Sequence, residues 1–314
     1  MQDVCLFAHF DKNDRMDDYV WRYLAKLKEL NFAIILISTS RLPPAEIDRL
    51  RGVCDDVLVR DNTGLDFASW AAGFARHGAA IGGRLLLAND SVYGPIGSLR
   101  AGIERLTREA ADFYGMVESV EIAPHLQSWF VLLEPRAVRS AAFKAIMAQP
   151  FAAMSRPQIV RAGEVGLSRQ LTAAGLRYEA LYRGGGAAGL PPRHDANPML
   201  LHWRDMLRDA GVPFVKIELL RDNPIGVEDA ATILREVARI DPEICGVIEA
   251  HLARAGGPAR PRRAPIARYR YALMRRYDRA RTERRLLAAA LARLQLELLA
   301  IPLVLWRRLR RSFA

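Results

Sequence analysis

The sequence predicts an α/β fold in which helices flank a mostly parallel sheet and a helical tail follows at the C-terminus. Of the 314 residues, 51% are hydrophobic, which is enough for a sizeable core. The first half alternates short apolar runs with helix-patterned segments, as in βαβ units. Several of these runs end in polar residues, and open α/β sheets bind ligands at the carboxyl ends of their strands. Charged residues make up 26%, which excludes a polytopic membrane protein and a wholly disordered chain.

In the first half, each expected strand is a short apolar run, and each expected helix has apolar residues three or four positions apart. Residues 33–37 are rich in isoleucine, which suits a buried parallel strand. The expected strands cover residues 4–9, 33–37, 56–59 and 84–88, and the expected helices cover residues 19–30, a segment led by Pro43 and Pro44, and residues 67–76.

The second half is less regular. The expected strands cover residues 112–116 and 128–133, and the expected helices cover residues 138–147, a segment that Glu164 begins or precedes and that runs through Leu171, and residues 197–210 and 227–239. Residues 183–192 contain too much glycine and proline for a regular element, and residues 256–265 have the composition of a linker. The predicted units are therefore a sheet domain over 1–225, a helical extension over 226–256 and a tail over 257–314.

The positive charge of the chain is concentrated at its C-terminal end. The formal net charge is +11, but residues 257–314 hold 16 arginines and only three acidic residues, whereas the rest holds 30 basic and 32 acidic residues. Binding to a polyanion therefore concerns the tail alone, and nucleic acid is disfavoured because no RNA-binding module is visible. Three scattered cysteines predict neither a disulfide framework nor a zinc site. No secretory signal is visible, so a cytoplasmic location is expected.

The most informative stretch covers residues 60–95. An Asn-x-Gly loop is followed by an acidic helix start and then by an apolar strand that ends in Asn89, Asp90 and Ser91. A carboxylate at such a strand end can hold a divalent cation that bridges the two phosphates of a nucleotide-sugar donor. Asp90 is the candidate for this catalytic metal ligand. The alternative is an ordinary turn, because Asn, Asp and Ser favour turns.

Six short motifs occur in order over residues 3–225. They are residues 7–11 (FAHFD), 60–67 (RDNTGLDF), 89–95 (NDSVYGP), 125–130 (HLQSWF), 164–168 (EVGLS), and 213–216 (PFVK) with 220–224 (LRDNP). This pattern resembles the rhamnan synthesis protein F family and, more broadly, the inverting GT-A glycosyltransferases. The resemblance implies a GT-A-like fold, a donor such as dTDP-L-rhamnose, a growing cell-surface glycan as acceptor, and a divalent cation, Mg²⁺ or Mn²⁺. The usual Asp-x-Asp motif reads Asn89-Asp90-Ser91 here, so it offers a metal at most one carboxylate.

Inverting transfer needs a base near the acceptor hydroxyl, and a carboxylate is the usual choice. The resemblance assigns this role to Glu164; the alternative is a glutamate that stabilises a helix N-terminus. Asp66 either caps the helix that follows it or reaches the nucleotide. The other expected ligands are His9, Asp11, Ser38, Arg60, Asn62, Gly64, Asn89, Ser91 and Lys216 for the donor, Gln127, Ser128 and Trp129 for the acceptor, and His202 as a second metal ligand.

Several of these residues also have plain structural explanations. His9 and Asp11 fit a surface turn, Trp129 or its neighbour fits the core, Lys216 fits a lysine that reaches from apolar surroundings to solvent, and a lone His202 fits a structural role. No P-loop, dinucleotide fingerprint, HExxH motif or nucleophile elbow occurs in the sequence. The competing hypothesis is a non-catalytic protein that binds glycan or nucleotide sugar and scaffolds polysaccharide assembly.

The tail predicts contact with a membrane surface. Residues 286–306 are apolar, but Arg293, Glu297 and Pro302 interrupt them. Because a charge near the centre of a spanning helix costs roughly 2.5 to 3.5 kcal/mol, a helix lying on an anionic membrane is favoured. The alternative is a helix that packs against protein. A peripheral position at the inner face of the plasma membrane would suit a lipid-linked acceptor.

Overall fold

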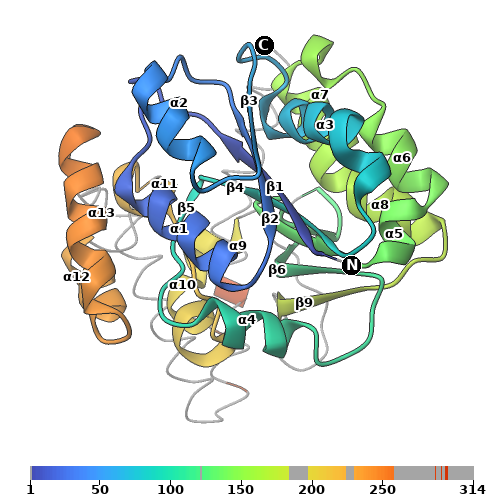
Figure 1. Cartoon of the computed structure of the whole chain (residues 1–314). Helices are drawn as coiled ribbons and strands as arrows, with labels where there is room; N and C mark the ends of the chain where they lie inside the picture. Colours follow the sequence, from blue (N-terminus) through green and yellow to red (C-terminus); the bar gives the residue numbers. More distant parts are fainter. Residues whose placement is uncertain are drawn as a thin grey trace.

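The structure is a computed structural model that describes residues 2–120, 122–183, 197–223 and 230–257, and residues 287, 291, 294 and 295. A mixed eight-stranded sheet forms its centre in the order β3-β2-β1-β4-β8-β6-β7, with β9 paired to β6 (Figure 1). The strands are β1 (Val4–His9), β2 (Ala33–Ser38), β3 (Asp56–Val59), β4 (Leu85–Asn89), β5 (Val92–Tyr93), β6 (Phe113–Ser119), β7 (His125–Leu126), β8 (Phe130–Leu133), β9 (Tyr178–Arg183) and β10 (Val215–Lys216).

The first four strands of the large sheet are parallel. β1 pairs with β2 on one side and with β4 on the other, and β2 pairs with β3. Their carboxyl ends therefore meet at one edge of the sheet. β8 and β6 continue the sheet in antiparallel fashion, and β9 runs parallel to β6. β5 and β10 form a separate antiparallel pair.

Helices cover both faces of the sheet (Figure 1). They are α1 (Asp18–Glu29), α2 (Pro44–Arg51), α3 (Leu65–His77), α4 (Leu99–Leu106), α5 (Pro135–Arg139), α6 (Ala141–Met147), α7 (Arg156–Ile159), α8 (Val165–Ala173), α9 (Pro198–Leu201), α10 (Trp203–Asp205), α11 (Ile217–Arg221), α12 (Ala230–Ala238) and α13 (Pro242–Arg254). Successive residues of β1 point to opposite faces, so Cys5 and Phe7 join the core under α1, whereas Leu6 and Ala8 join the core under α3. The predicted fold class is thus confirmed.

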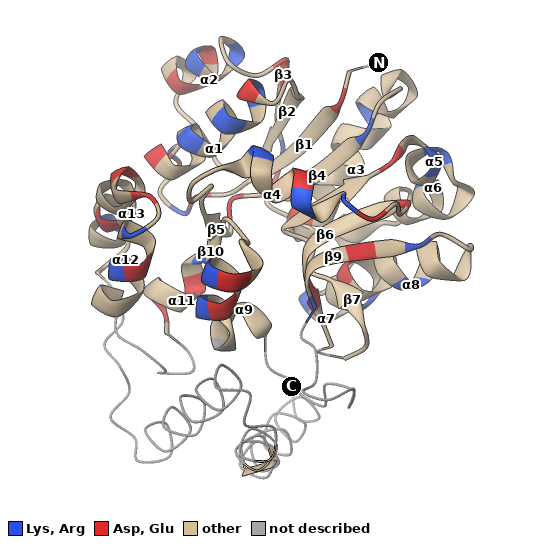
Figure 2. Ribbon diagram, turned by 90° about the horizontal axis from the view of Figure 1, so that it is seen from below, with Lys and Arg blue, Asp and Glu red and all other residues tan. Residues whose placement is uncertain are grey.

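Helices α12 and α13 belong to the core under α1. Ile233 of α12 and Ile248 of α13 lie in the same apolar cluster as Tyr23 of α1. The Arg22 guanidinium of α1 also donates to Asp241, the residue before α13, over 2.6 Å. Figure 2 shows basic and acidic residues interspersed over these helices. The proposed boundaries at residues 225 and 256 stay a prediction.

Two expected helices differ from the structure. The helix expected over 138–147 is divided at Ser140, whose hydroxyl caps α6 by accepting the Phe143 N–H over 3.1 Å. The helix expected over 197–210 is broken into α9, α10 and a π-helical turn, Met206–Ala210. Glu164 directly precedes α8, as expected, but it also ends the π-helical segment Val160–Glu164, which continues α7 into α8. Because the helical turns are continuous, Glu164 does not lie at a free helix N-terminus.

Candidate active site

The carboxyl ends of β1, β2 and β4 bring three predicted site residues together. Strand pairing aligns His9 with Ser38, and His9 Nδ1 lies 3.0 Å from Ser38 Oγ. Asp90 follows β4 directly, and its Oδ2 accepts the backbone N–H of Phe10 over 2.9 Å. Burial lowers the pKa of His9 to about 4, so its imidazole is neutral near pH 7.

Asp66 points to the same edge from the first turn of α3. The helix starts after Gly64, whose φ of +72° is a left-handed conformation that favours glycine. Asn89 Nδ2 donates to Asp66 Oδ2 over 2.7 Å. Gly64, not Asp66, occupies the cap position of α3, and no side chain caps that end. The contact with Asn89 therefore ties Asp66 to the strand edge.

Charged groups from distant parts of the chain act on Asp66. Burial raises the pKa of the Asp66 carboxyl to about 6; the hydrogen bond from Asn89 opposes this rise, and the Glu164 carboxylate adds to it. Lys216 of β10 and Arg156 of α7 lower the same pKa. Helix α3, the π-helical segment and β10 thus converge on one polar site.

Asp90 adds another carboxylate to this site. Its side chain is only 12% exposed, and burial is the main cause that raises its pKa well above the usual range. Asp66 and Asp11 raise the pKa further because like charges repel, while the hydrogen bond from Phe10 opposes the rise. The site therefore has a surplus of negative charge wherever its carboxyl groups are ionised.

The loop before α3 is held by Arg60. Its guanidinium donates to the Thr63 carbonyl oxygen over 2.9 Å and to Ser69 Oγ over 3.3 Å. Asn62, in the same loop, is exposed. At the end of β4, Ser91 Oγ donates to Asn89 Oδ1 over 2.7 Å. These contacts shape the edge of the sheet around the carboxylates.

Glu164 is placed by an irregular turn of helix. Gly163, just before it, packs against α3, where a Cβ would lie 2.7 Å from the Phe67 ring. The backbone N–H and the hydroxyl of Ser128 both donate to Glu164 Oε1, each over 3.2 Å. Among the described residues, both hydrogen bonds to this carboxylate reach the same oxygen. π-Helical turns are frequent at functional sites.

Ser128 lies in a bulge between β7 and β8. Leu126 pairs with Glu118 and Val131 with Gly115, so residues 127–130 face only residues 116–117 of β6. A bulge of this kind re-aims side chains. It explains why the strand expected over 128–133 starts two residues later, and why Ser128 reaches the π-helical segment.

The other residues of the bulge are fixed by the protein. Gln127 Nε2 donates to Asn197 Oδ1 over 2.8 Å, and Gln127 Oε1 accepts from Trp129 Nε1 over 3.0 Å. Trp129 is 3% exposed, and its ring meets that of Phe214 edge-on. Trp129 and its neighbour Phe130 both belong to the core, so neither presents an open ring face to a sugar.

The structure brings together three possible cation ligands, and they differ from the expected pair, Asp90 and His202. Ligand atoms of Asp11, Asp17 and His251 lie within 4.8 Å of one another. Two carboxylates and an imidazole fit a divalent cation in type, although Arg254 already forms an ion pair with Asp17. His202 is placed between α9 and α10, where its ring stacks on Tyr182.

Three residues near this edge were not singled out in the sequence. Tyr19 donates its hydroxyl to the backbone oxygen of Asp90 over 3.1 Å. Tyr93 of β5 lies 2.5 Å from Nδ1 of His251, which α13 brings back to the sheet edge. No local motif could reveal the contact of Tyr93 with His251, because its two residues lie 158 positions apart.

The fold and the site define a class. A mostly parallel α/β sheet whose carboxyl edge gathers carboxylates, amides and a lysine is that of an α/β protein with a polar ligand site at its strand ends. The model of the family "Rhamnan synthesis protein F" matches residues 34–278, and the chain belongs to this family. The resemblance to this family, stated from the six motifs, is thereby confirmed.

A curated relative and two solved structures were also found. The "Virulence protein VirA" of Vibrio anguillarum is 23% identical over 263 residues, which cover 74% of this chain and 84% of that protein. A protein of Desulfovibrio desulfuricans G20 named as a nucleotide-diphospho-sugar transferase is 9% identical, with a TM-score of 0.39 over 77% of this chain and 99% of the other. A protein of Bacillus anthracis named as a glucose-1-phosphate thymidylyltransferase, in complex with a sucrose, is 10% identical, with a TM-score of 0.37 over 57% and 86%.

The tail expected over 257–314 lies outside the described residues, except for Gly257 and four positions between 287 and 295. In the part of the chain that the structure describes, no helix has both the length and the apolar character that a bilayer span requires.

Proposed function

We propose that the protein transfers a deoxyhexose, L-rhamnose, from a nucleotide-sugar donor such as dTDP-L-rhamnose to a lipid-linked cell-surface glycan, with inversion at the anomeric carbon. The observation that carries the proposal is the convergence of polar groups at the carboxyl edge of the parallel strands. Asn89 binds Asp66 there, the Phe10 N–H binds Asp90, and Lys216 pairs with Val92 just beyond β4. Glu164 and Lys216 both act on the Asp66 carboxyl. Membership of the rhamnan synthesis protein F family supports the sugar and the class of acceptor.

The donor half of the site lies around β1, β2 and β4. A diphosphate is an anion, so a site rich in carboxylates needs added positive charge to bind it. Lys216 and Arg156 supply part of this charge, as their effect on Asp66 indicates. A divalent cation, held by Asp90 or by Asp11 and Asp17, would supply the rest by binding phosphate oxygens. The neutral imidazole of His9 faces Ser38 and adds no charge.

Glu164 is the proposed general base. Ser128 engages one of its oxygens twice, which orients the carboxylate and leaves the other oxygen for an acceptor hydroxyl. Removal of the hydroxyl proton by Glu164 would let the oxygen attack the anomeric carbon, while the nucleoside diphosphate leaves from the opposite side. Inversion follows from a single displacement.

The C-terminal tail is proposed to hold the enzyme on an anionic membrane. Leu287, Leu291 and Leu294 are helical and 83%, 61% and 53% exposed. Their spacing of four and three residues places them on one face of a helix. An exposed leucine face in a segment with 16 arginines suits the surface of a membrane that contains anionic lipids.

The test is transfer by the full-length protein. Purified protein is incubated with Mg²⁺, a panel of nucleotide sugars and a lipid-linked acceptor, and product is measured by mass spectrometry. The dTDP-L-rhamnose reaction should give an acceptor heavier by one deoxyhexose. Glu164→Gln should abolish transfer and keep donor binding, because the amide preserves shape but does not accept the proton. Donor binding without turnover in the wild type would instead support the scaffold hypothesis.

A further inference from the structure

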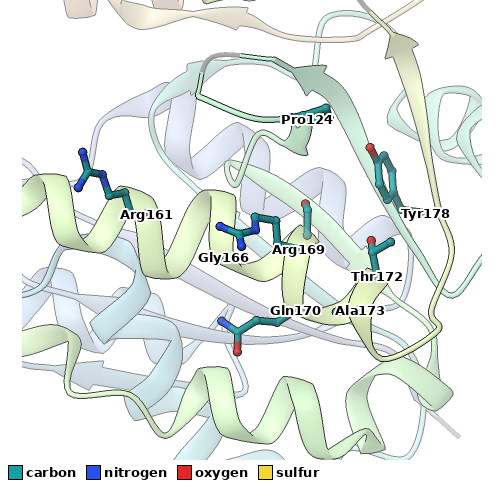
Figure 3. A pocket seen from close by; sticks show the side chains of 9 residues that line it. Pro124, Arg161, Gly166, Arg169, Gln170, Thr172, Ala173 and Tyr178 are labelled. Atoms are coloured by element: carbon teal, nitrogen blue, oxygen red, sulfur yellow. The ribbon is translucent and has the colours of Figure 1, made fainter. Parts of the chain in front are cut away.

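A groove runs along the exposed side of α8, next to the proposed active site. Its volume is about 510 Å³, within the range of sites for small ligands. Figure 3 shows the side chains that line it: Arg161 and Arg169 lie along the helix, and Thr172 and Tyr178 lie at the end formed by β9. Pro124, in the segment before β7, closes the upper side in this view.

The groove contains two guanidinium groups that no described side chain engages. Among the described residues, the side chains of Arg161 and Arg169 have no ion-pair or hydrogen-bond partner. Nearby arginines differ, because Arg136 pairs with Asp112 over 2.8 Å and Arg183 pairs with Glu179 over 2.7 Å. Two guanidinium groups therefore line the groove without a partner in the described part of the chain.

Polar groups of neutral side chains accompany the two arginines. The side chains of Gln170 and Thr172 line the groove and have no described partner. Two carboxylates near the β9 end are engaged by the protein: Glu118 accepts the Tyr178 hydroxyl over 2.5 Å, and Glu179 pairs with Arg183. The free groups of the groove are mainly donors, which suits a ligand with a negative charge and several hydroxyl groups.

The groove and Glu164 share two elements of structure. Ser168 lines the groove one helical turn after Glu164, and its Oγ accepts the Leu126 backbone N–H over 3.0 Å. Leu126 leads directly into the bulge from which Ser128 contacts Glu164. A chain bound in the groove would therefore lie beside the proposed base.

We propose that this groove binds an anionic sugar unit of the acceptor glycan, one that carries a carboxylate or a phosphate. This inference rests on the proposed function, because it places the acceptor beside Glu164. Arg161 and Arg169 would bind the anionic group, since guanidinium groups match carboxylate and phosphate oxygens in pairs. Gln170 and Thr172 would bind the sugar hydroxyls.

The experiment measures binding of small glycosides to the full-length protein by NMR titration, without donor. The probes are methyl β-D-glucuronide, the 6-phosphate of methyl β-D-glucoside, the neutral methyl β-D-glucoside, and inorganic phosphate. The variants are Arg161→Gln, Arg169→Gln and the double substitution. Arg139→Gln is the matched control, because Arg139 of α5 is also exposed and outside the groove. Thermal unfolding of each variant checks the fold.

At least one anionic glycoside should bind about tenfold or more tightly than the neutral one, and its affinity should fall as salt rises. The double variant should lose about tenfold in affinity, while Arg139→Gln should match the wild type. Equal binding of the neutral glycoside, or full binding by the folded double variant, would overturn the inference. If inorganic phosphate competes as well as the sugar phosphate, the groove is a simple anion site and sugar recognition is disproved.

The experiments distinguish a failure of the proposed function from a failure of the groove inference. Transfer that persists in Glu164→Gln would remove Glu164 from the mechanism, yet would leave the affinities for the glycosides unchanged. Conversely, a groove that binds no glycoside, in a protein that still transfers sugar and needs Glu164, would refute the groove alone. Donor binding should be equal in the wild type and in the double arginine variant.

Discussion

The carboxyl group of Asp66 should make the unliganded protein less stable than a variant with a neutral side chain at this position. Its pKa is raised from 3.8 to about 6, chiefly by burial. A difference of about 2 pKa units corresponds to about 3 kcal/mol, at 1.36 kcal/mol per unit. Asp66→Asn removes this penalty, and the amide oxygen of the new side chain can still accept from Asn89. We therefore expect the variant to gain about 1 to 3 kcal/mol at pH 7.5, the lower value allowing for partial exposure.

The gain should depend on pH in a defined direction. A carboxyl group whose pKa is higher in the folded state binds more protons folded than unfolded between about pH 4 and 6, so its penalty grows as pH rises through this window. At pH 4.5 the gain should shrink to about a third of its value at pH 7.5. Unfolding by urea at both pH values, in the presence of a chelator, measures both quantities.

A matched control separates this effect from a general change of charge. Asp61 lies in the loop before α3 and is exposed, so Asp61→Asn removes the same charge without removing a buried carboxylate. It should change stability by less than about 0.5 kcal/mol. An Asp66→Asn variant that is no more stable than wild type at pH 7.5, or whose gain is equal at both pH values, would refute the reasoning. Transfer activity should fall in the same variant, because a stability penalty at a functional site is usually retained for function.

Three further outcomes are expected. Asp90→Asn should lower transfer at least about tenfold with the fold intact, measured by turnover and thermal unfolding. Unchanged turnover in this variant would remove Asp90 from the mechanism, and wild-type turnover that survives excess chelator would remove the cation. Gly163→Ala should cost about 1 to 3 kcal/mol in urea unfolding, because its Cβ would meet the Phe67 ring, and wild-type stability would contradict this packing. Deletion of residues 257–314 should abolish flotation with anionic liposomes but spare transfer to a soluble acceptor; a truncated protein that still floats would disprove the role of the tail.

The parallel half of the fold was predictable because its strands are continuous apolar runs. Residues 4–9 and 33–37 of the sequence are apolar enough to specify strands buried on both faces, and the structure contains them as β1 and β2. The elements of the second half were harder to predict, because their breaks and bulges depend on tertiary contacts. The break at Ser140 and the bulge at residues 127–130 come from a cap and from strand pairing, which periodicity does not encode.

The candidate site was predictable where polar residues end parallel strands. His9, Ser38 and Asp90 follow this rule, and the structure brings them together. The same rule could not reveal the partners that α13 brings to the sheet edge, because His251 and Arg254 look like ordinary helix residues in the sequence. Nor could it show that Glu164 lies on a π-helical turn, since such turns have no simple pattern of residues.

Helix α13 contacts the N-terminal part of the chain at the sheet edge. Arg254 and His251 both contact Asp17, which precedes α1, and His251 also meets Tyr93 beside the donor half of the site. Asp17 is 4% exposed, so the ion pair with Arg254 is shielded from salt far more than a surface pair. The proposed membrane segment begins three residues after Arg254. The ion pair with Asp17 and the contact with Tyr93 therefore fix α13 against the sheet edge that carries the proposed donor half of the site.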